Sequence, residues 1–268
     1  MDIALVYMVA GISSRFGGRI KQFSEVGPNN ETLIEYSMNQ ALPAGFTKIV
    51  LIVGNRTEHP FKEKFGNSYK EIPIQYTLQK FDEEKRDRPW GTVDALCTIK
   101  DAVKCPFVIC NGDDIYGEES FQILIDQLKT KSTGATTGYK LGNVLPEKGG
   151  VNRAIFEVNS NDEIQSLKEE FDLTKENLDE KGLSENSLCS MNIFGLQPDT
   201  VRKLNGILEK FKEEHKGDRR IECLLPNELG NLIKENKLII NLYPTNGKWF
   251  GVTNPGDEIK IKESLKSS

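Results

Sequence analysis

Histidine and cysteine are scarce in this chain, and their scarcity limits the chemistry open to it. Among 268 residues there are two histidines, His59 and His215, each flanked by charged or turn residues, so both are predicted to lie on the surface. The cysteines form no CxxC pair, and an odd, scattered set disfavours both a disulfide framework and a structural zinc site. The five cysteines are Cys97, Cys105, Cys110, Cys189 and Cys223. A histidine relay or a His/Cys metal site is therefore not expected.

Long apolar runs and basic runs are also lacking. No run approaches the roughly 20 apolar residues that a bilayer span needs, and the start at Met1 has no basic segment leading to a cleavage site. With 35 basic against 40 acidic residues the formal net charge is -5, and no Lys/Arg-rich stretch marks a nucleic-acid surface. We expect a soluble, cytoplasmic protein without membrane or nucleic-acid partners, and its oligomeric state stays open.

The first half of the sequence alternates apolar strands with amphipathic helices. This alternation is typical of βαβ units around a largely parallel sheet. Strands are predicted over residues 3–9, 48–53, 74–78 and 106–110. Helices are predicted over residues 31–42, over 91–103 with Leu96, Ile99 and Val103 inward, and around the stripe of Phe121, Leu124, Ile125 and Leu128.

The second half changes character. Residues 171–187 are so charged that we expect a mobile loop or lid there. Strands are predicted over residues 151–158, 163–167, 188–196, 238–242 and 248–252. Helices are predicted over residues 198–215 and 221–235, the latter with Leu224, Leu225, Leu229 and Leu232 aligned, and a short charged helix closes the chain. With no internal repeat, we interpret residues 1–268 as a single α/β domain, a three-layer sandwich with a mixed, mostly parallel sheet.

A small, Gly- and Ser-rich loop, AGISSRFGGRIKQ at residues 10–22, follows the first strand. In open α/β sheets ligands bind at the carboxyl ends of strands, and such a loop exposes backbone N–H groups to phosphate oxygens. Arg15 and Lys21 add positive charge there. A dinucleotide fingerprint does not fit, because Ser13 stands at the second glycine position and no acidic residue ends the second strand. A Walker loop does not fit either, because no Gly-Lys-Ser/Thr occurs.

Several segments in the right order carry a family resemblance. They are the loop at residues 10–21, Gln79 with WGTVDA at 90–95, NGDDIYG at 111–117, SMN at 190–192 and WFGVT at 249–253. Together they resemble the sugar-1-phosphate nucleotidyltransferases, in particular the uridylyltransferase domain that makes UDP-N-acetylglucosamine. The resemblance covers nearly the whole chain and implies a Rossmann-like, GT-A-like fold, with a nucleotide-binding half at 1–130 and a sugar-phosphate-binding half at 131–268.

The resemblance implies a reaction and a set of site residues. A nucleoside triphosphate and a sugar-1-phosphate would give an NDP-sugar and pyrophosphate. The sugar phosphate is already an anionic nucleophile, so alignment and charge neutralisation suffice. Arg15 would hold the β and γ phosphates and Lys21 the α-phosphate or the sugar phosphate. The remaining implied nucleotide contacts are Ala10, Gly11, Ser13, Ser14, Gln79, Gly91 and Thr92, and the implied sugar contacts are Gly150, Glu169 and Asn192.

Magnesium is the implied cofactor. Asp113 is the expected ligand, because Mg²⁺ prefers one or two carboxylates plus phosphate oxygens and waters. Asp114, its neighbour on an extended chain, is expected to point the other way. Relatives place a second carboxylate or amide ligand near the last strand, where Gly251 and Thr253 align best, so Thr253, Asn254 or water is left to complete the shell.

The base and the sugar remain open at this point. Uracil is preferred, with thymine or cytosine as alternatives, and N-acetylglucosamine-1-phosphate or a hexose-1-phosphate is the preferred second substrate. A cytidylyl- or thymidylyltransferase acting on another phosphorylated acceptor is one rival. A catalytically inactive nucleotide-binding module of the same fold, suggested by the missing carboxylate near Trp249 and by Ser13, is the other.

Overall fold

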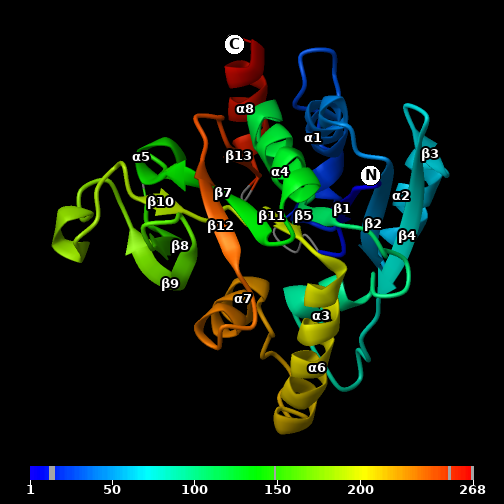
Figure 1. The fold of residues 1–268 in the computed structure, drawn as a ribbon. Coiled ribbons are helices and arrows are strands. Elements are labelled where there is room, and N and C mark those ends of the chain that lie inside the picture. Colours follow the sequence, from blue (N-terminus) through cyan, green and yellow to red (C-terminus); the bar gives the residue numbers. More distant parts are fainter. Residues whose placement is uncertain (12–15, 148, 253–254, 267–268) are drawn as a thin grey trace.

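One mixed sheet organises the chain (Figure 1). The computed structural model describes residues 1–11, 16–147, 149–252 and 255–266. Within them an 11-stranded sheet has the order β3-β4-β2-β1-β5-β11-β7-β10-β8-β9, with β12 beside β7. Its strands are β1 (Ala4–Met8), β2 (Lys48–Gly54), β3 (Ser68–Tyr69), β4 (Ile72–Gln79), β5 (Phe107–Asn111), β7 (Gly134–Lys140), β8 (Val151–Val158), β9 (Ile164–Leu173), β10 (Leu188–Cys189), β11 (Phe194–Leu196) and β12 (Ile240–Pro244). A two-stranded ribbon is made of β6 (Asp114–Ile115) and β13 (Phe250–Gly251).

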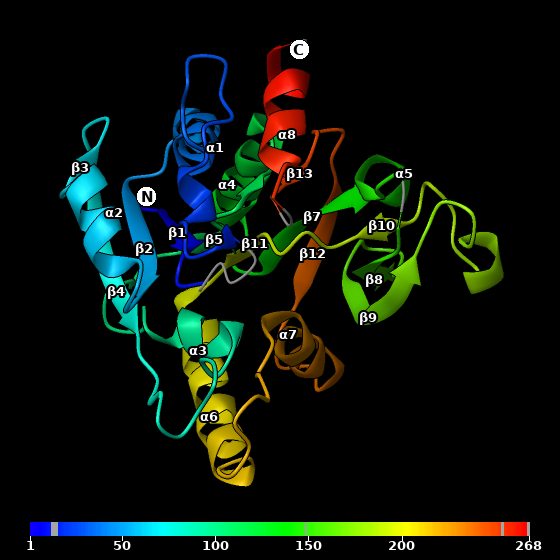
Figure 2. The same ribbon diagram turned by 180° about the vertical axis from the view of Figure 1, so that it is seen from behind.

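Helices cover both faces of this sheet. They are α1 (Leu33–Ala41), α2 (Glu58–Phe65), α3 (Thr92–Cys97), α4 (Glu118–Thr130), α5 (Leu141–Val144), α6 (Pro198–Glu214), α7 (Leu225–Lys234) and α8 (Asp257–Lys266), with short 3-10 turns η2 (Lys21–Phe23), η3 (Leu42–Ala44) and η4 (Asp179–Lys181). In Figures 1 and 2, α1 and α4 lie above the sheet, and α3, α6 and α7 lie below it.

The central strands β1, β2 and β5 are apolar on both faces because both of their faces are buried. Along β1, Leu5 and Tyr7 pack in one core cluster with α1 and α4, whereas Ala4 and Val6 pack in the other with α3, α6 and α7. This period-2 division follows from the pleat of a strand, and a parallel sheet covered on both sides gives continuous apolar runs. The predicted three-layer sandwich with a mixed sheet is confirmed.

Parallel pairing is concentrated in the first half of the chain. β4, β2, β1 and β5 are parallel neighbours, linked by crossovers that run through α1, α2 and α3. In the second half β11, β7, β10, β8 and β9 pair antiparallel with their neighbours, while β12 is parallel to β7. The carboxyl ends of β1, β2, β4 and β5 therefore share one edge of the sheet, where ligands of open α/β folds bind.

Two expectations for the second half needed correction. The strand predicted over 188–196 is broken into β10 and β11, because Asn192 adopts a positive φ of 58° that ends the extended run. The predicted mobile loop over 171–187 begins as the end of β9, and Leu173 and Leu178 are buried in the core. The burial of these two leucines was not predicted, because charged residues surround both of them in the sequence.

The helix predictions also needed correction at three points. The helix expected over 91–103 ends as α-helix at Cys97, although its three predicted inward residues are all buried. Leu224, expected on the apolar stripe of α7, precedes the helix and is 41% exposed. The helix α2 was not predicted, because it buries only Phe61 and Phe65 among charged residues.

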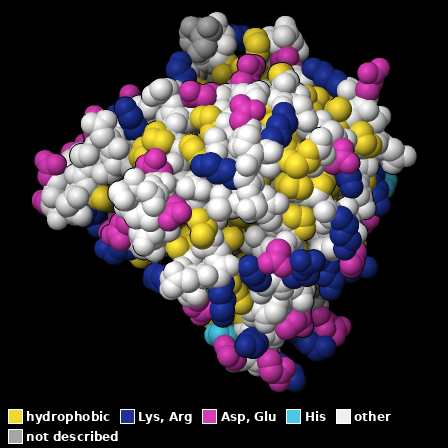
Figure 3. All heavy atoms as spheres, viewed as in Figure 1, with side chains coloured by type: hydrophobic (Ala, Val, Ile, Leu, Met, Phe, Trp, Pro, Cys, Tyr) yellow, Lys and Arg dark blue, Asp and Glu magenta, His cyan; other side chains and the backbone are white. Residues whose placement is uncertain are grey.

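The surface mixes both signs of charge. On the face in Figure 3, Lys/Arg and Asp/Glu side chains are interspersed rather than segregated. His59 is exposed, and the His215 ring stacks on Phe211 at 4.3 Å. All five cysteines are free. No helix in the described residues combines the length and the apolar character that crossing a bilayer requires.

Candidate active site

The loop that follows β1 and the acidic turn that follows β5 lie side by side. The two strands are parallel neighbours with Met8 opposite Asn111, and the Gly112 N–H donates to the Met8 carbonyl at 3.1 Å. A side chain at position 112 would meet Val9 at 2.3 Å, so only glycine allows this approach. Sequence segments that are far apart in the chain therefore converge on one edge of the sheet.

Lys21 and Asp113 form an ion pair at this edge. Lys21 opens the turn η2, and its ammonium also donates to the Val252 carbonyl at 3.3 Å. The Val252 N–H in turn donates to the Asp113 carbonyl at 3.1 Å. The two side chains are 20% and 23% exposed, so the pair is reachable from solvent. The structure thus brings together two of the three predicted catalytic residues. Arg15, Ser13, Ser14 and Thr253 lie outside the described residues.

Asp114 turns away from this pair into the interior. It is 6% exposed, and its Oδ2 accepts hydrogen bonds from Asn111 Nδ2 at 2.9 Å and from the Tyr116 hydroxyl at 3.1 Å. Burial, reinforced by the neighbouring Asp113 charge, raises the pKa of Asp114 to about 7. The Tyr116 hydroxyl also lies 3.0 Å from the Met191 carbonyl. The expected opposite orientation of the two aspartates is what the structure shows.

Asp113 is the described carboxylate best placed to ligate a cation. Asp114 already has partners, and a Cβ at Gly251 would lie 2.7 Å from Asp114 Oδ1 and 2.4 Å from the Trp249 ring, so no carboxylate fits there. Among the residues that the structure describes, no three His, Cys, Asp or Glu side chains gather as metal ligands. A site with one carboxylate suits Mg²⁺, which keeps several waters and binds phosphate oxygens of a substrate.

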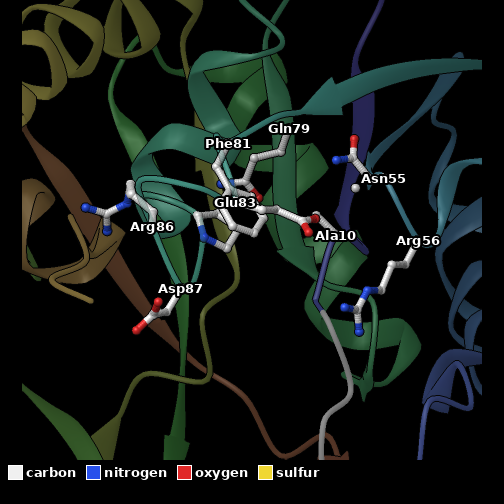
Figure 4. A pocket seen from close by; sticks show the side chains of 10 residues that line it. Ala10, Asn55, Arg56, Gln79, Phe81, Glu83, Arg86 and Asp87 are labelled. Atoms are coloured by element: carbon white, nitrogen blue, oxygen red, sulfur yellow. The ribbon is translucent and has the colours of Figure 1, made fainter. Parts of the chain in front are cut away.

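A cavity of about 290 Å³ opens beside Ala10, at the start of the loop that follows β1 (Figure 4). Ala10 and Gln79 line it, together with Phe81, Arg56 and Arg86. Figure 4 shows Gln79 and Phe81 grouped over the cavity, between Arg86 on one side and Arg56 on the other. Gly11, the next predicted nucleotide contact, is exposed just beyond Ala10. The cavity is large enough for one planar ring system and borders the loop that would hold phosphates.

Of the three predicted base contacts, Gln79 lines this cavity, and Gly91 lies in hydrogen-bond contact with it. Gln79 ends β4 and is 6% exposed, and its Nε2 donates to the Gly91 carbonyl at 3.0 Å. Gly91 has a φ of 98°, and a Cβ there would lie 2.5 Å from the Cys223 carbonyl oxygen. The Thr92 hydroxyl accepts from the Leu225 N–H at 2.7 Å. Gly91 and Thr92 are therefore braced by a segment from the second half of the chain.

The three predicted sugar contacts lie on or beside the antiparallel strands. Glu169 on β9 is paired with Ala154 on β8, whose carbonyl accepts from the Ser190 N–H at 2.8 Å, two residues before Asn192. The side-chain amide of Asn192 has no hydrogen-bond partner among the described residues. Burial raises the pKa of Glu169, and Arg153 opposes that shift. Gly150 precedes β8, and a Cβ there would lie 1.8 Å from Asp172 Oδ1.

Arg153 is a residue of interest that sequence reasoning missed. Its guanidinium lies 5.4 Å from the centre of the Trp249 ring and donates to the carbonyls of Asn152 at 2.9 Å and Val144 at 3.3 Å. Its Nε and the Trp249 Nε1 are buried without a partner, and no carboxylate in the described part of the chain forms an ion pair with it. Burial lowers the pKa of Arg153. A lone arginine within a strand carries no local motif, so no pattern of residues pointed to it.

Residues 18–232 match the family model described as nucleotidyl transferase. The chain belongs to the nucleotidyl transferase family. It is 29% identical over 211 residues to the bifunctional protein GlmU of Methanococcus maripaludis (strain C7 / ATCC BAA-1331), a match over 78% of this chain and 41% of that protein. This nucleotidyl transferase chain thus aligns with about two fifths of the length of the curated relative.

Solved structures share the nucleotidyl transferase fold over the whole chain. A UDP-glucose pyrophosphorylase complexed with UDP-glucose superposes with a TM-score of 0.69 at 15% identity, covering 100% of this chain and 99% of that one. A CTP:phosphocholine cytidylyltransferase from Streptococcus pneumoniae superposes with a TM-score of 0.68 at 15% identity, covering 99% and 100%. At these identities the likeness shows the fold and leaves the substrates open.

Proposed function

We propose that this chain transfers a uridylyl group from UTP to a sugar-1-phosphate, N-acetylglucosamine-1-phosphate or a hexose-1-phosphate, and releases pyrophosphate. The observation that carries the proposal is the Lys21–Asp113 pair, which stands where the loop after β1 meets the acidic turn after β5. Ala10, at the start of the same loop, lines a cavity of base size. Family membership supports the reaction type. The names of the curated relative and of the UDP-glucose complex favour UTP and a sugar phosphate.

In the proposed reaction an oxygen of the sugar phosphate attacks the α-phosphorus of the triphosphate. A bond forms between them, the bond from the α-phosphorus to the bridging oxygen breaks, and pyrophosphate leaves with that electron pair. No proton need be removed from the nucleophile, so the scarcity of histidine is no obstacle. Lys21 neutralises charge on the phosphate as it is transferred, and preorganised charge of this kind is a large catalytic term.

Asp113 would hold Mg²⁺ through its carboxylate, together with phosphate oxygens and waters. When bound, the cation supplies neutralisation of phosphate charge and lowers repulsion between the two anionic substrates. Asp114 is kept out of that role by its hydrogen bonds to Asn111 and Tyr116. Those bonds hold the turn and so fix the position of Asp113.

On the sugar-phosphate side we assign the polar contacts to Glu169, Asn192 and the backbone at Gly150. The Asn192 amide offers both a donor and an acceptor for a hydroxyl or an N-acetyl group. Arg153 is a largely buried positive charge of this half, and we assign it to the phosphate or another anionic group of the sugar substrate. Its burial beside Trp249, with no ion pair to a carboxylate of the described residues, favours an anionic partner.

Cytidylyl transfer to a different phosphorylated alcohol is the second candidate. The specific observation in its favour is that the phosphocholine cytidylyltransferase superposes as well as the UDP-glucose pyrophosphorylase does, with TM-scores of 0.68 and 0.69. Both candidates use the same phosphate chemistry, so they differ only in the base and in the second substrate.

Release of pyrophosphate over a matrix of triphosphates and phosphorylated alcohols tests the proposal. UTP with a sugar-1-phosphate and Mg²⁺ should be the productive combination, and a chelator should abolish turnover. Asp113→Asn should lower kcat at least 10²-fold, as expected for loss of an electrostatic group at the transferred phosphate. Asp101→Asn is the matched control, because that side chain is 87% exposed and belongs to none of the segments that form the candidate site. Productive turnover with CTP and not UTP selects the second candidate, and no turnover with any pair rejects both.

A further inference from the structure

The side-chain amide of Gln79 is held in one orientation. Its Nε2 donates one hydrogen bond to the Gly91 carbonyl at 3.0 Å and another to Asp94 Oδ2 at 2.9 Å. A carbonyl and a carboxylate only accept, so Nε2 and not Oε1 must face them. Both N–H groups are thereby used. The Oε1 atom has no donor among the described residues, and it is the polar atom that Gln79 offers to the cavity.

Asp94 is in turn fixed by a lysine from a distant helix. Lys212 on α6 lies with its Nζ 2.7 Å from Asp94 Oδ1, leaving Oδ2 for Gln79. The Asp94 side chain is 9% exposed and that of Lys212 is 30% exposed. Each carboxylate oxygen therefore has its own partner, and the low exposure strengthens both interactions relative to the surface.

The surroundings keep this arrangement from moving. The Cys223 N–H donates to the Trp90 carbonyl at 2.8 Å, and the Cys223 carbonyl accepts from the Val93 N–H at 3.1 Å. The Arg86 guanidinium stacks 3.4 Å from the centre of the Trp90 ring and donates to the carbonyls of Asp218 and Ile221. The loop between Gln79 and α3 is clamped to the segment that follows α6, so Gly91 and Asp94 stay in place under Gln79.

We propose that Asp94, held by Lys212, is a positioning residue that fixes Gln79 with its side-chain carbonyl oxygen toward the base. The cavity would then select the imide N–H of uracil or thymine over the unprotonated ring nitrogen of cytosine. This inference rests on the proposed function, because it takes the cavity as the base site. A free glutamine could rotate its amide and offer either a donor or an acceptor. Locked as it is, Gln79 can only accept, and ring position 3 is a donor in uracil and an acceptor in cytosine.

Asp94→Asn is the informative substitution. The asparagine side chain keeps the size of aspartate but has only one oxygen, which accepts the hydrogen bond from Lys212. An N–H group then faces Gln79 Nε2, and the lock is lost. We expect the preference for UTP over CTP, measured as the ratio of kcat/KM values, to fall about tenfold or more, the range expected when a buried hydrogen bond is lost or left unmade.

Three further variants separate positioning from structure. Lys212→Met removes the ammonium and should lower the same ratio, whereas Lys212→Arg should restore it. Lys216→Met, two residues after the end of α6 and 79% exposed, is the matched control and should leave the ratio unchanged. The ratio compares two nucleotides on one protein sample, so partial unfolding lowers both rates and does not move it. Melting temperatures of all variants are measured alongside.

Direct nucleotide binding makes the two failures distinguishable. Titration calorimetry with UTP and CTP reports base preference even where turnover is slow. Wild-type preference for UTP that Asp94→Asn and Lys212→Met both reduce supports the inference. Preference for UTP that survives both substitutions in folded protein overturns the inference while the proposed function stands. Wild-type preference for CTP over UTP overturns the inference and selects cytidylyl transfer, the second candidate function. Failure of every nucleotide to bind or react overturns the proposed function, and the inference falls with it.

Discussion

The Lys21 ammonium lies against the Asp113 carboxylate, although the two residues follow different strands of the parallel sheet. The strands β1 and β5 are neighbours, so the loop after one and the turn after the other meet at a single edge. This contact joins the cationic and the anionic part of the site. It also means that a change at either residue alters the electrostatic environment of the other.

Lys21→Met should reduce kcat about 10²–10³-fold, because one preorganised charge is lost from the transferred phosphate. Lys21→Arg should recover part of the rate, since the charge remains but the guanidinium is larger than a point charge. Steady-state pyrophosphate release measures both. Lys104→Met serves as the control, because that side chain is 72% exposed. Unchanged kcat in Lys21→Met would remove Lys21 from the chemistry.

The free energy of unfolding should fall as the pH rises from about 4 to 7, because Asp114 ionises at a higher pH in the folded than in the unfolded state. The pKa of this carboxyl is raised from 3.8 to about 7 in the fold, so in that interval the folded state holds a proton that the unfolded state has lost. A protonated Asp114 can donate to the Tyr116 hydroxyl, whose own proton then serves the Met191 carbonyl. Urea unfolding at several pH values checks the slope.

Asp114→Asn should flatten that dependence, because an amide has no proton to lose in this range and fills the same space. The comparison uses the difference between the two proteins at each pH, which cancels the contributions of all other groups. A wild-type curve that runs parallel to that of the variant would show that Asp114 ionises at its ordinary pKa.

Gly251→Ala should destabilise the fold by roughly 1–3 kcal/mol, the usual cost of overpacking. The added methyl group would lie within 2.7 Å of Asp114 Oδ1 and of the Trp249 ring. Gly206→Ala is the matched control, since a Cβ there meets nothing within 4 Å and the position is inside α6. It should stabilise the protein by about 0.5–1 kcal/mol, because alanine is the better helix former. Thermal melting distinguishes the opposite signs.

Arg153→Met should raise the KM for the sugar phosphate about tenfold or more, with little change in the KM for the triphosphate. Arg153 is on β8, which pairs with β9 and its Glu169, and neither residue lines the cavity assigned to the base. Assays with a neutral hexose-1-phosphate and with a uronic acid-1-phosphate separate binding of the phosphate from binding of a carboxylate. Arg202→Met is the control, because that side chain is 75% exposed. Equal effects on both substrates' KM values would count against the assignment.

Asn192→Gly and Asn192→Ala separate the backbone role of Asn192 from its side-chain role. Both remove the amide and should weaken sugar-phosphate binding alike. Only alanine should cost stability, on the order of 1 kcal/mol, because the φ of 58° suits glycine and asparagine and strains other residues. Paired measurements of KM and unfolding free energy check this. Wild-type KM in the glycine variant would show that Asn192 is there for its backbone alone.

Local patterns predicted the elements whose burial is uniform. The strands β1, β2 and β5 are apolar along nearly their whole length, and α4 carries its apolar stripe at helical spacing, so each could be predicted from the sequence. The break at Asn192 was not visible, because asparagine is compatible with both an extended and a left-handed backbone. The helix α2 was missed because only two of its residues reach the core.

The site divides in the same way. Lys21 and Asp113 stand in short segments with recognisable order, and the fold brings them into contact. The role of Asp94 depends on its ion pair with Lys212 on another helix. A local sequence pattern cannot predict an ion pair that tertiary packing creates. Arg153 shows the same limit, since its contact with Trp249 and the unpartnered Nε arise only from tertiary packing.

The clamp between the Gln79–Gly91 loop and the segment after α6 bears on how this protein could be re-engineered. Lys212, Cys223 and Leu225 belong to the later part of the chain yet support the wall beside the base cavity. A chimera that exchanged the later part for that of a relative, with the aim of changing the sugar, would also replace these supports. Such a graft should alter the choice of nucleotide as well, so the two specificities are not independently exchangeable modules.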